Sequence, residues 1–176
     1  MSDFPYNLVI PDGLVTIDPN SMCSLGYASY TGAAVSVAWQ SANRAIYIPF
    51  RISRSILVLN MYTFNGAVVN GNLDIGIYDK HGTRIVSSGS TAQAGVSSIQ
   101  TLNITDTVIG PGLFYMALAL STNGTILFQN TGATGMFMKA MGLAQQANAF
   151  PLPANATFAT YTDYLWHFGL TARSIV

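Results

Sequence analysis

The sequence predicts an all-β protein: a single antiparallel β-sandwich of jelly-roll type over residues 33–176, preceded by an extended N-terminal arm over residues 1–32. Three observations lead to this fold class. Apolar and polar residues alternate with period two in several segments after residue 34, as in strands with one buried face. Turn dipeptides such as Asn65-Gly66 and Asn123-Gly124 separate these segments at short intervals. Helical periodicity is weak throughout, and only residues 135–146 are ambiguous.

The arm is predicted from the turn formers that interrupt residues 1–32, among them Pro5, Pro11 and Pro19. Large apolar side chains lie near these turns, and burying one of them is worth roughly 1.5–3 kcal/mol. We therefore expect the arm to dock as an edge strand or clamp on a neighbouring subunit or partner by strand addition. Its expected anchors are Phe4, Tyr6, Leu8 and Ile10.

One face of the alternating strands is expected to form the core. Its predicted members are Ile46, Ile48, Phe50, Leu73, Ile75, Ile77, Met116 and Leu118. Pro49 lacks the N–H that a ladder needs, so its strand should be at an edge or bulged there. Residues 56–59 and 113–120 are apolar on both faces, which indicates central strands covered on both sides, or strands covered by a neighbouring subunit.

Charge is scarce in this chain. Only 8% of the residues are charged, there is no Glu, and the formal net charge is zero, whereas ordinary soluble domains carry about 25% charged residues. A net charge near zero favours association. We therefore expect a surface used in permanent contacts and a homo-oligomer, with a trimer as the expected form. A secreted or sugar-binding module has a similar polar, uncharged surface and is the alternative.

Other partners are not expected. Nucleic-acid binding needs clustered basic residues, and the nearest approach to a cluster is Arg44, Arg51 and Arg54. The longest unbroken apolar stretch, residues 113–120, is far shorter than the roughly 18 residues of a membrane helix. Cys23 is the only cysteine, so an intrachain disulfide is ruled out. The N-terminus shows no signal-peptide pattern, and we expect assembly in a cytoplasm.

Catalytic and metal sites are not expected either. The only histidines are His81, in a predicted hairpin turn, and His167, in the apolar C-terminal strand. A zinc site would need more ligands close by, and no nucleophile elbow is present. Asp74 and Asp79 lie near each other in one strand, but Asp74 is on its polar face and is expected to be exposed. The sequence therefore predicts a protein that is not an enzyme and holds no cofactor or metal.

Aromatic side chains supply the candidate contact residues. Tyr47 and Tyr78 fall opposite the core positions, and Tyr62 follows the same pattern. Tyrosine is amphipathic and stiff, so it suits both sugar stacking and protein interfaces. Trp166, in the C-terminal strand, fits either a structural role or an interface, whereas Trp39 is on a core-facing pattern. The predicted ligand or interface residues are Tyr47, Tyr62, Tyr78 and Trp166.

Three segments resemble small tailed-bacteriophage virion proteins: residues 43–51, residues 72–90 and residues 111–117. The second segment is also similar to the hairpins of many carbohydrate-binding and adhesin sandwiches. The resemblance as a whole covers roughly residues 42–120, about half the chain. The resemblance implies a β-sandwich carried on a phage particle as a capsid decoration, fibre or tail component, and it transfers no catalytic residue.

These observations lead to one functional prediction with alternatives. We expect a non-enzymatic structural or accessory protein of a bacteriophage virion, assembled in the host cytoplasm, that binds other virion proteins and copies of itself. The alternative is a carbohydrate-binding module that recognises a host surface glycan. An enzyme acting on glycans is a third hypothesis.

Overall fold

The computed structural model describes residues 22–24, 35–129, 142–158, 160–161 and 165–174. Every regular element in these ranges is a strand, and none of them contains a helix. The strands are β1 (Met22–Ser24), β2 (Val35–Ala38), β3 (Arg44–Ile52), β4 (Ile56–Phe64), β5 (Asn72–Asp79), β6 (Arg84–Ser87), β7 (Thr91–Ala92), β8 (Ile99–Ile109), β9 (Gly112–Leu120), β10 (Thr125–Gln129), β11 (Ala144–Gln146), β12 (Thr160–Tyr161), β13 (Leu165–Trp166) and β14 (Phe168–Ser174).

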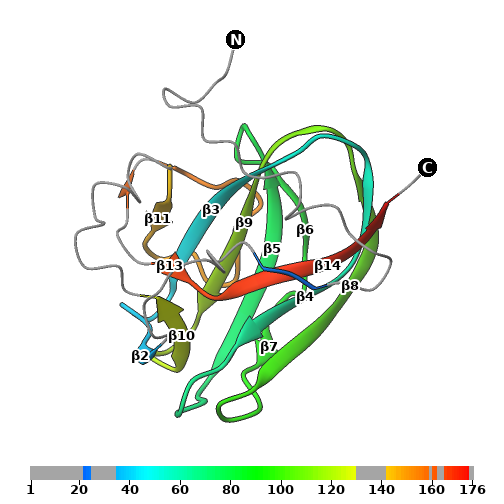
Figure 1. Cartoon of the computed structure of the whole chain (residues 1–176). Coiled ribbons are helices and arrows are strands. Elements are labelled where there is room, and N and C mark those ends of the chain that lie inside the picture. The colour runs from blue at the N-terminus through cyan, green and yellow to red at the C-terminus, as the bar shows by residue number, and fades with distance from the viewer. Residues whose placement is uncertain (1–21, 25–34, 130–141, 159, 162–164, 175–176) are drawn as a thin grey trace.

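These strands form two large antiparallel sheets and a small one (Figure 1). The four-stranded sheet has the order β1-β14-β4-β8. The seven-stranded sheet has the order β12-β11-β3-β9-β5-β6, and β7 also pairs with β5. The small sheet has the order β13-β10-β2. The predicted all-β, antiparallel class is confirmed.

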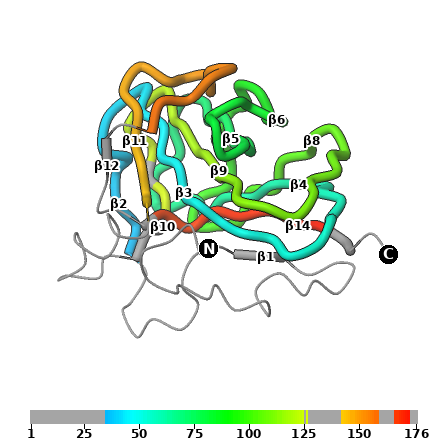
Figure 2. Tube along the Cα trace, turned by 90° about the horizontal axis from the view of Figure 1, so that it is seen from above, coloured from blue at the N-terminus to red at the C-terminus, as the bar shows by residue number. Residues whose placement is uncertain are grey.

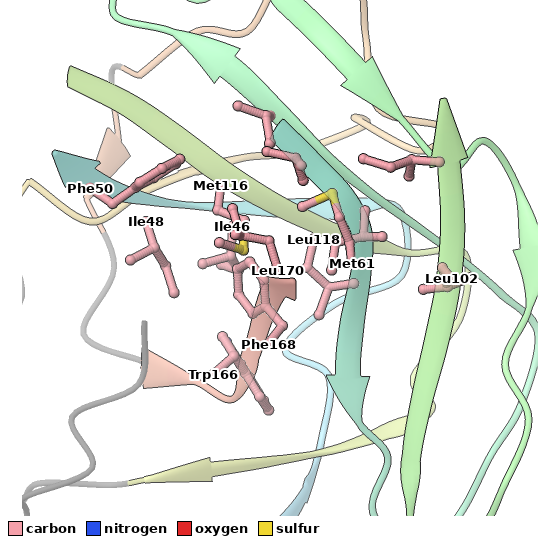
Figure 3. Close-up of a cluster of buried hydrophobic side chains, with 14 of the residues drawn as sticks. Ile46, Ile48, Phe50, Met61, Leu102, Met116, Leu118, Trp166, Phe168 and Leu170 are labelled. Atoms are coloured by element: carbon pink, nitrogen blue, oxygen red, sulfur yellow. The ribbon is translucent and has the colours of Figure 1, made fainter. Parts of the chain in front are cut away.

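The core lies between the two large sheets, which pack face to face as a β-sandwich (Figure 3). The seven-stranded sheet contributes the eight residues predicted from the alternation, and each is at most 2% exposed: Ile46, Ile48, Phe50, Leu73, Ile75, Ile77, Met116 and Leu118. The four-stranded sheet faces them with Met61, Leu102, Phe168 and Leu170. Period-two patterning therefore located the core face correctly.

A further layer covers the outer face of the seven-stranded sheet. Residues 147–158, which we call the covering segment, lie across β9 and β5 on the side away from β14 (Figure 2). Leu152 packs there above Gly76, where an added Cβ would lie 3.1 Å from Leu152 Cδ1 and 2.7 Å from the carbonyl oxygen of Val86. A glycine at this position thus lets the covering segment approach the sheet closely.

Two sequence expectations about the strands can be compared with this arrangement. The strand of Pro49, β3, is neither an edge strand nor bulged there, because it lies between β11 and β9 and pairs regularly with β9 through Pro49. Pro49 is tolerated because β11 pairs with β3 only from Ala45 to Tyr47, so one side of β3 is unpaired by a described strand at Pro49. The run 113–120 lies within β9, which is central between β3 and β5. Both faces of β9 are covered by the chain itself, one by the core and the other by the covering segment. A neighbouring subunit is therefore not needed to cover this strand.

Most of the predicted arm lies outside the described residues, including Phe4, Tyr6, Leu8 and Ile10. Its described part is β1, which pairs antiparallel with β14 of the same chain. The boundary between an arm at 1–32 and a domain at 33–176 stays a prediction. No helix in the described ranges is long and apolar enough to cross a membrane.

Candidate functional site

Tyr47 and Tyr78 occupy the face of the seven-stranded sheet that the sequence places opposite the core. We expected that face to be exposed, and this expectation was wrong, because both side chains are fully buried. The covering segment closes over them, and Phe158 makes an edge contact with Tyr47 at 5.1 Å between ring centroids. Alternation identifies the two faces of a strand, but it does not show whether a distant segment covers the second face.

The hydroxyl groups of these tyrosines are used inside the molecule. The Tyr47 hydroxyl donates to Gln146 Oε1 at 3.0 Å, and the Tyr78 hydroxyl donates to the carbonyl oxygen of Pro153 at 2.7 Å. The two rings meet edge to face at 5.4 Å. Burial raises the pKa of both phenols well above the ordinary value. Both tyrosines therefore fasten residues 146–158 to the sheet, and neither presents a surface to a ligand.

Asp74 is buried as well, although its place on the polar face led us to expect exposure. Its Oδ2 accepts the backbone N–H of Leu152 at 3.0 Å, and its Oδ1 accepts the Ser88 hydroxyl at 3.4 Å. The Arg84 guanidinium lies close enough to attract the carboxylate, and it donates to the carbonyl oxygen of Leu152. Burial outweighs these contacts and raises the pKa of Asp74. Asp74 and Arg84 together hold Leu152 through its backbone.

The other two predicted contact residues are buried too. Tyr62 is 1% exposed and Trp166 is fully buried. Trp166 packs against Trp39, with ring centroids 4.6 Å apart, so its role is structural in this fold. The core position predicted for Trp39 is confirmed. The four predicted residues thus do not converge on an exposed site: Tyr47 and Tyr78 meet under the covering segment, whereas Tyr62 and Trp166 lie elsewhere.

The two histidines differ in their surroundings. His81 is exposed in its turn, as predicted, and its backbone N–H donates to Asp79 Oδ1 at 2.8 Å. The ring of His167 makes an edge contact with Phe64 at 6.1 Å, and burial lowers its pKa. Within the described ranges, His167 Nε2 is buried without a hydrogen-bond partner. The described residues contain no group of three or more His, Cys, Asp or Glu that could hold a metal.

An amide network that the sequence did not predict ties loops together at one end of the sandwich. Gln93 Nε2 donates to Asn65 Oδ1 at 3.0 Å, and Asn65 Nδ2 donates to Gln100 Oε1 at 3.0 Å. Gln100 Nε2 in turn donates to the carbonyl oxygen of Ala92 at 2.8 Å. These bonds hold the start of β8 against β7 and the residues that follow it, so this part of β8 is fixed from the inner side.

The outer side of β8 is the feature best placed to contact a partner. β8 is the last strand of its sheet, and on its other side it pairs with β4 (Figures 1 and 2). Asn65 N–H donates to the carbonyl oxygen of Ser98 at 2.9 Å. Because hydrogen-bonded and non-hydrogen-bonded pairs alternate in an antiparallel ladder, Gln100 and Leu102 also bond to β4. The N–H and C=O groups of Ile99, Thr101 and Asn103 therefore point away from β4.

The edge strands β6 and β8, which lie on the same side of the sandwich in different sheets, differ in how their outer sides are covered. At the edge strand β6, the N–H of Arg84 donates to the carbonyl oxygen of Ala154, and Thr83 forms a bridge with Asn155. Within the described residues, no strand or loop pairs with β8 on its outer side, although β6 of the facing sheet lies near it. The side chains of Ile99, Thr101 and Asn103 are exposed beside this edge. The arrangement offers a row of backbone donors and acceptors to an incoming strand.

Comparisons with known proteins identify no family for the chain. No protein-family model matches it, and no curated protein matches its sequence significantly. The function is therefore inferred from the geometry of the chain itself.

Proposed function

We propose that the chain is a non-enzymatic structural or accessory protein of a bacteriophage virion, which acts by binding other virion proteins and further copies of itself. The observation that carries the assembly part of this proposal is the outer side of β8, with which no described residue pairs. Natural proteins usually protect such edges with Lys, Pro or a covering loop, because an unpaired edge is a template for another chain. Between Ile99 and Asn103, ahead of its bulge, β8 contains no Lys, Pro or charged residue, which suits an edge that is paired in its working state.

Exposed apolar side chains near the start of β8 support the same proposal. Val68, Val96 and Ile99 are 55%, 58% and 43% exposed. The segments that carry them are joined, because Ser97 N–H donates to the carbonyl oxygen of Gly66 at 2.9 Å and Phe64 pairs with Ile99. Exposed apolar groups on linked segments favour burial against another protein where they form a continuous patch.

The finer parts of the fold belong to this proposal. We propose that the sandwich is of jelly-roll type and that residues 1–32 form an arm, whose anchors Phe4, Tyr6, Leu8 and Ile10 reach a neighbouring subunit while Met22–Ser24 pairs with β14 of its own chain. The antiparallel two-sheet architecture is compatible with this topology. The segments that resemble virion proteins lie on β3, on β5 with β6, and on β9, so they contribute to one sheet.

The phage assignment itself rests on that resemblance and on the scarcity of charge. The particle position that it implies is a capsid decoration, a tail component or a fibre, with assembly in the host cytoplasm. The carbohydrate-binding alternative took its expected stacking residues from outward tyrosines. Because Tyr47 and Tyr78 are buried, they give that alternative no stacking surface.

Quantitative mass spectrometry of purified particles of the encoding phage tests the proposal. We expect the chain in the particles at a fixed ratio to the major capsid protein. A ratio near one would assign it to capsid decoration, and a small ratio would assign it to the tail or a fibre. The chain present in infected cells but absent from washed particles would contradict the proposal.

A further inference from the structure

The outer edge of β8 has a geometry that fits a second copy of the same strand. The outward backbone groups belong to Ile99, Thr101 and Asn103, which are evenly spaced about Thr101. In an antiparallel pair with a two-fold axis at Thr101, Ile99 faces Asn103 of the second copy and Thr101 faces its own counterpart. All three positions then become hydrogen-bonded pairs, each exchanging two backbone bonds. No residue needs to change its pairing with β4.

Charge also favours a second copy as the occupant. A two-fold contact places each residue near its own counterpart, so any charged residue near the axis meets a like charge and destabilises the pair. Residues 99–103 contain no charged side chain, and Asp106 is the only one in β8. Across the axis Thr101 meets Thr101, and threonine pairs across neighbouring strands are favourable.

The length of the pairing is limited by an irregularity in β8. Val58 of β4 pairs with Thr107 of β8, and Asn60 of β4 pairs with Asn103 of β8, so the register of the two strands shifts between these pairs. The extra residues of β8 lie between Asn103 and Thr107, and bulges of this kind end the regular ladder. Pairing with a second copy is therefore confined to residues 99–103. A contact of this size is weak alone and gains strength when many copies are held in one assembly.

We propose that two copies of this chain associate through antiparallel pairing of their β8 strands, centred on Thr101, so that two four-stranded sheets become one continuous sheet. This inference rests on the proposed assembly function and names the contact through which the chain binds itself. The contact is isologous and gives a two-fold dimer, which differs from the trimer that the sequence led us to expect.

Sedimentation velocity over a range of protein concentrations tests the pairing with a matched pair of variants. Thr101→Lys places two like charges at the axis, whereas Thr105→Lys adds the same charge to another exposed position of the same strand, outside residues 99–103. We expect a monomer–dimer equilibrium for the unaltered chain and for Thr105→Lys. Thr101→Lys should raise the dissociation constant by about tenfold or more, since a loss near 1.4 kcal/mol corresponds to tenfold.

Cysteine cross-linking supplies a positive test on the Cys23→Ser background. Facing residues of a hydrogen-bonded antiparallel pair have Cα atoms about 5.5 Å apart, within the range that a disulfide spans. Thr101→Cys should therefore form a covalent dimer under mild oxidation, and Thr105→Cys should form much less. A monomer at all concentrations, a trimer unaffected by Thr101→Lys, or equal cross-linking of both variants would overturn the proposal.

The pairing and the virion function fail in different ways. If the chain is found in purified particles but does not pair through β8, the pairing is wrong and the proposed function stands. If it pairs through β8 but is absent from particles, the dimer stands and the virion assignment is wrong.

Discussion

The outer face of the seven-stranded sheet and the outer edge of β8 look alike in the sequence and differ in the structure. Both present residues that alternate with core positions: Tyr47 and Tyr78 on the sheet face, and Thr101 and Asn103 along β8. The first pair is fully buried beneath the covering segment, whereas Thr101 and Asn103 are exposed beside backbone groups that point outward. The covering segment, which is remote in sequence from β3 and β5, decides that the sheet face is buried and that the β8 edge remains accessible to a partner.

The two surfaces therefore have different roles: the covered face stabilises the domain, and the β8 edge is free to contact a partner. The covered face is fastened by specific bonds, such as Tyr78 to Pro153 and Asp74 to Leu152. Substitutions there should unfold or loosen the domain. Substitutions at the β8 edge should leave the domain intact and change its associations. The following predictions test that separation, from the largest expected effect on the free energy of unfolding to the smallest.

Tyr47→Ala should lower the free energy of unfolding by about 3–5 kcal/mol, as truncation of a buried aromatic side chain does. The reason is that Tyr47 is fully buried and contacts both Tyr78 and Phe158. Chemical denaturation followed by fluorescence measures this. Tyr47→Phe is the control, because it keeps the buried ring and removes only the hydroxyl, which bonds to Gln146 and Tyr78. It should cost about 0.5–1.5 kcal/mol for each bond lost. A loss below about 1 kcal/mol for Tyr47→Ala would mean that the covering segment does not bury this residue in solution.

Ile75→Ala should cost about 2–5 kcal/mol, because it opens a cavity between the two large sheets. Ile75 is fully buried in the inter-sheet core. This variant gives the reference value for the inner face, against which Tyr47→Ala is compared for the outer face. Comparable losses for the two, measured by the same denaturation experiment, would show that the outer face acts as a second core. A negligible loss for Ile75→Ala would contradict the sandwich packing.

Asp74 should give stability an unusual pH dependence. Its pKa is raised in the folded state above the ordinary value of 3.8, chiefly by burial, so the folded state binds the proton more tightly than the unfolded state does. The contribution of Asp74 is therefore fully present below pH 3.8 and is lost as the pH rises through the raised folded value. Denaturation midpoints should be measured from below pH 3.8 upward for the unaltered chain and for Asp74→Asn. The Asn side chain still offers an oxygen acceptor to Leu152 N–H but does not titrate, so this variant should lose the pH-dependent part of the stability that Asp74 contributes. An unchanged profile would contradict the buried position.

Asp74→Ala is the companion variant at neutral pH. It leaves the buried N–H of Leu152 without its acceptor, and an unsatisfied buried group costs about 1–3 kcal/mol. Limited proteolysis should then cut within residues 147–158 sooner than in the unaltered chain, since Asp74 holds this segment. Cleavage at the same rate in both proteins would show that other contacts suffice to hold it.

Thr101→Ala should change the free energy of unfolding by no more than about 0.5 kcal/mol, as exposed substitutions usually do. The side chain is exposed on the last strand of its sheet. Measured under dilute conditions, so that association does not contribute, this variant is the counterpart of Tyr47→Ala. A large loss would mean that the edge is covered within the monomer.

Local patterning predicted the all-β class and the inter-sheet core, because a strand buried on one face alternates with period two. Ile46, Ile75 and Met116 were found in this way. Patterning failed for Tyr47, Tyr78 and Asp74, because their cover comes from a segment far along the chain. Leu152 lies 78 residues from Asp74, Pro153 lies 75 residues from Tyr78, and Phe158 covers Tyr47.

The sequence of β8 indicates a strand, but it does not indicate that this strand lies at the edge of a sheet. Leu102 and Ile104 alternate with Thr101, Asn103 and Thr105, which indicates a strand. Whether a strand lies at an edge depends on which other strands pair with it, and here the partner β4 begins more than forty residues earlier in the chain. The amide network of Asn65, Gln93 and Gln100 was missed for the same reason, since it joins three separate segments.

Residue-resolved amide hydrogen exchange by NMR, at several protein concentrations, tests the availability of the β8 edge most directly. At low concentration, the amides of Thr101 and Asn103 should exchange quickly, whereas those of Leu102 and Tyr78 stay protected. Protection of Thr101 and Asn103 should then rise with concentration in the unaltered chain and not in Thr101→Lys. If Thr101 were protected equally at every concentration, the edge would be covered within the monomer, and if it were never protected, β8 would not pair with a second copy.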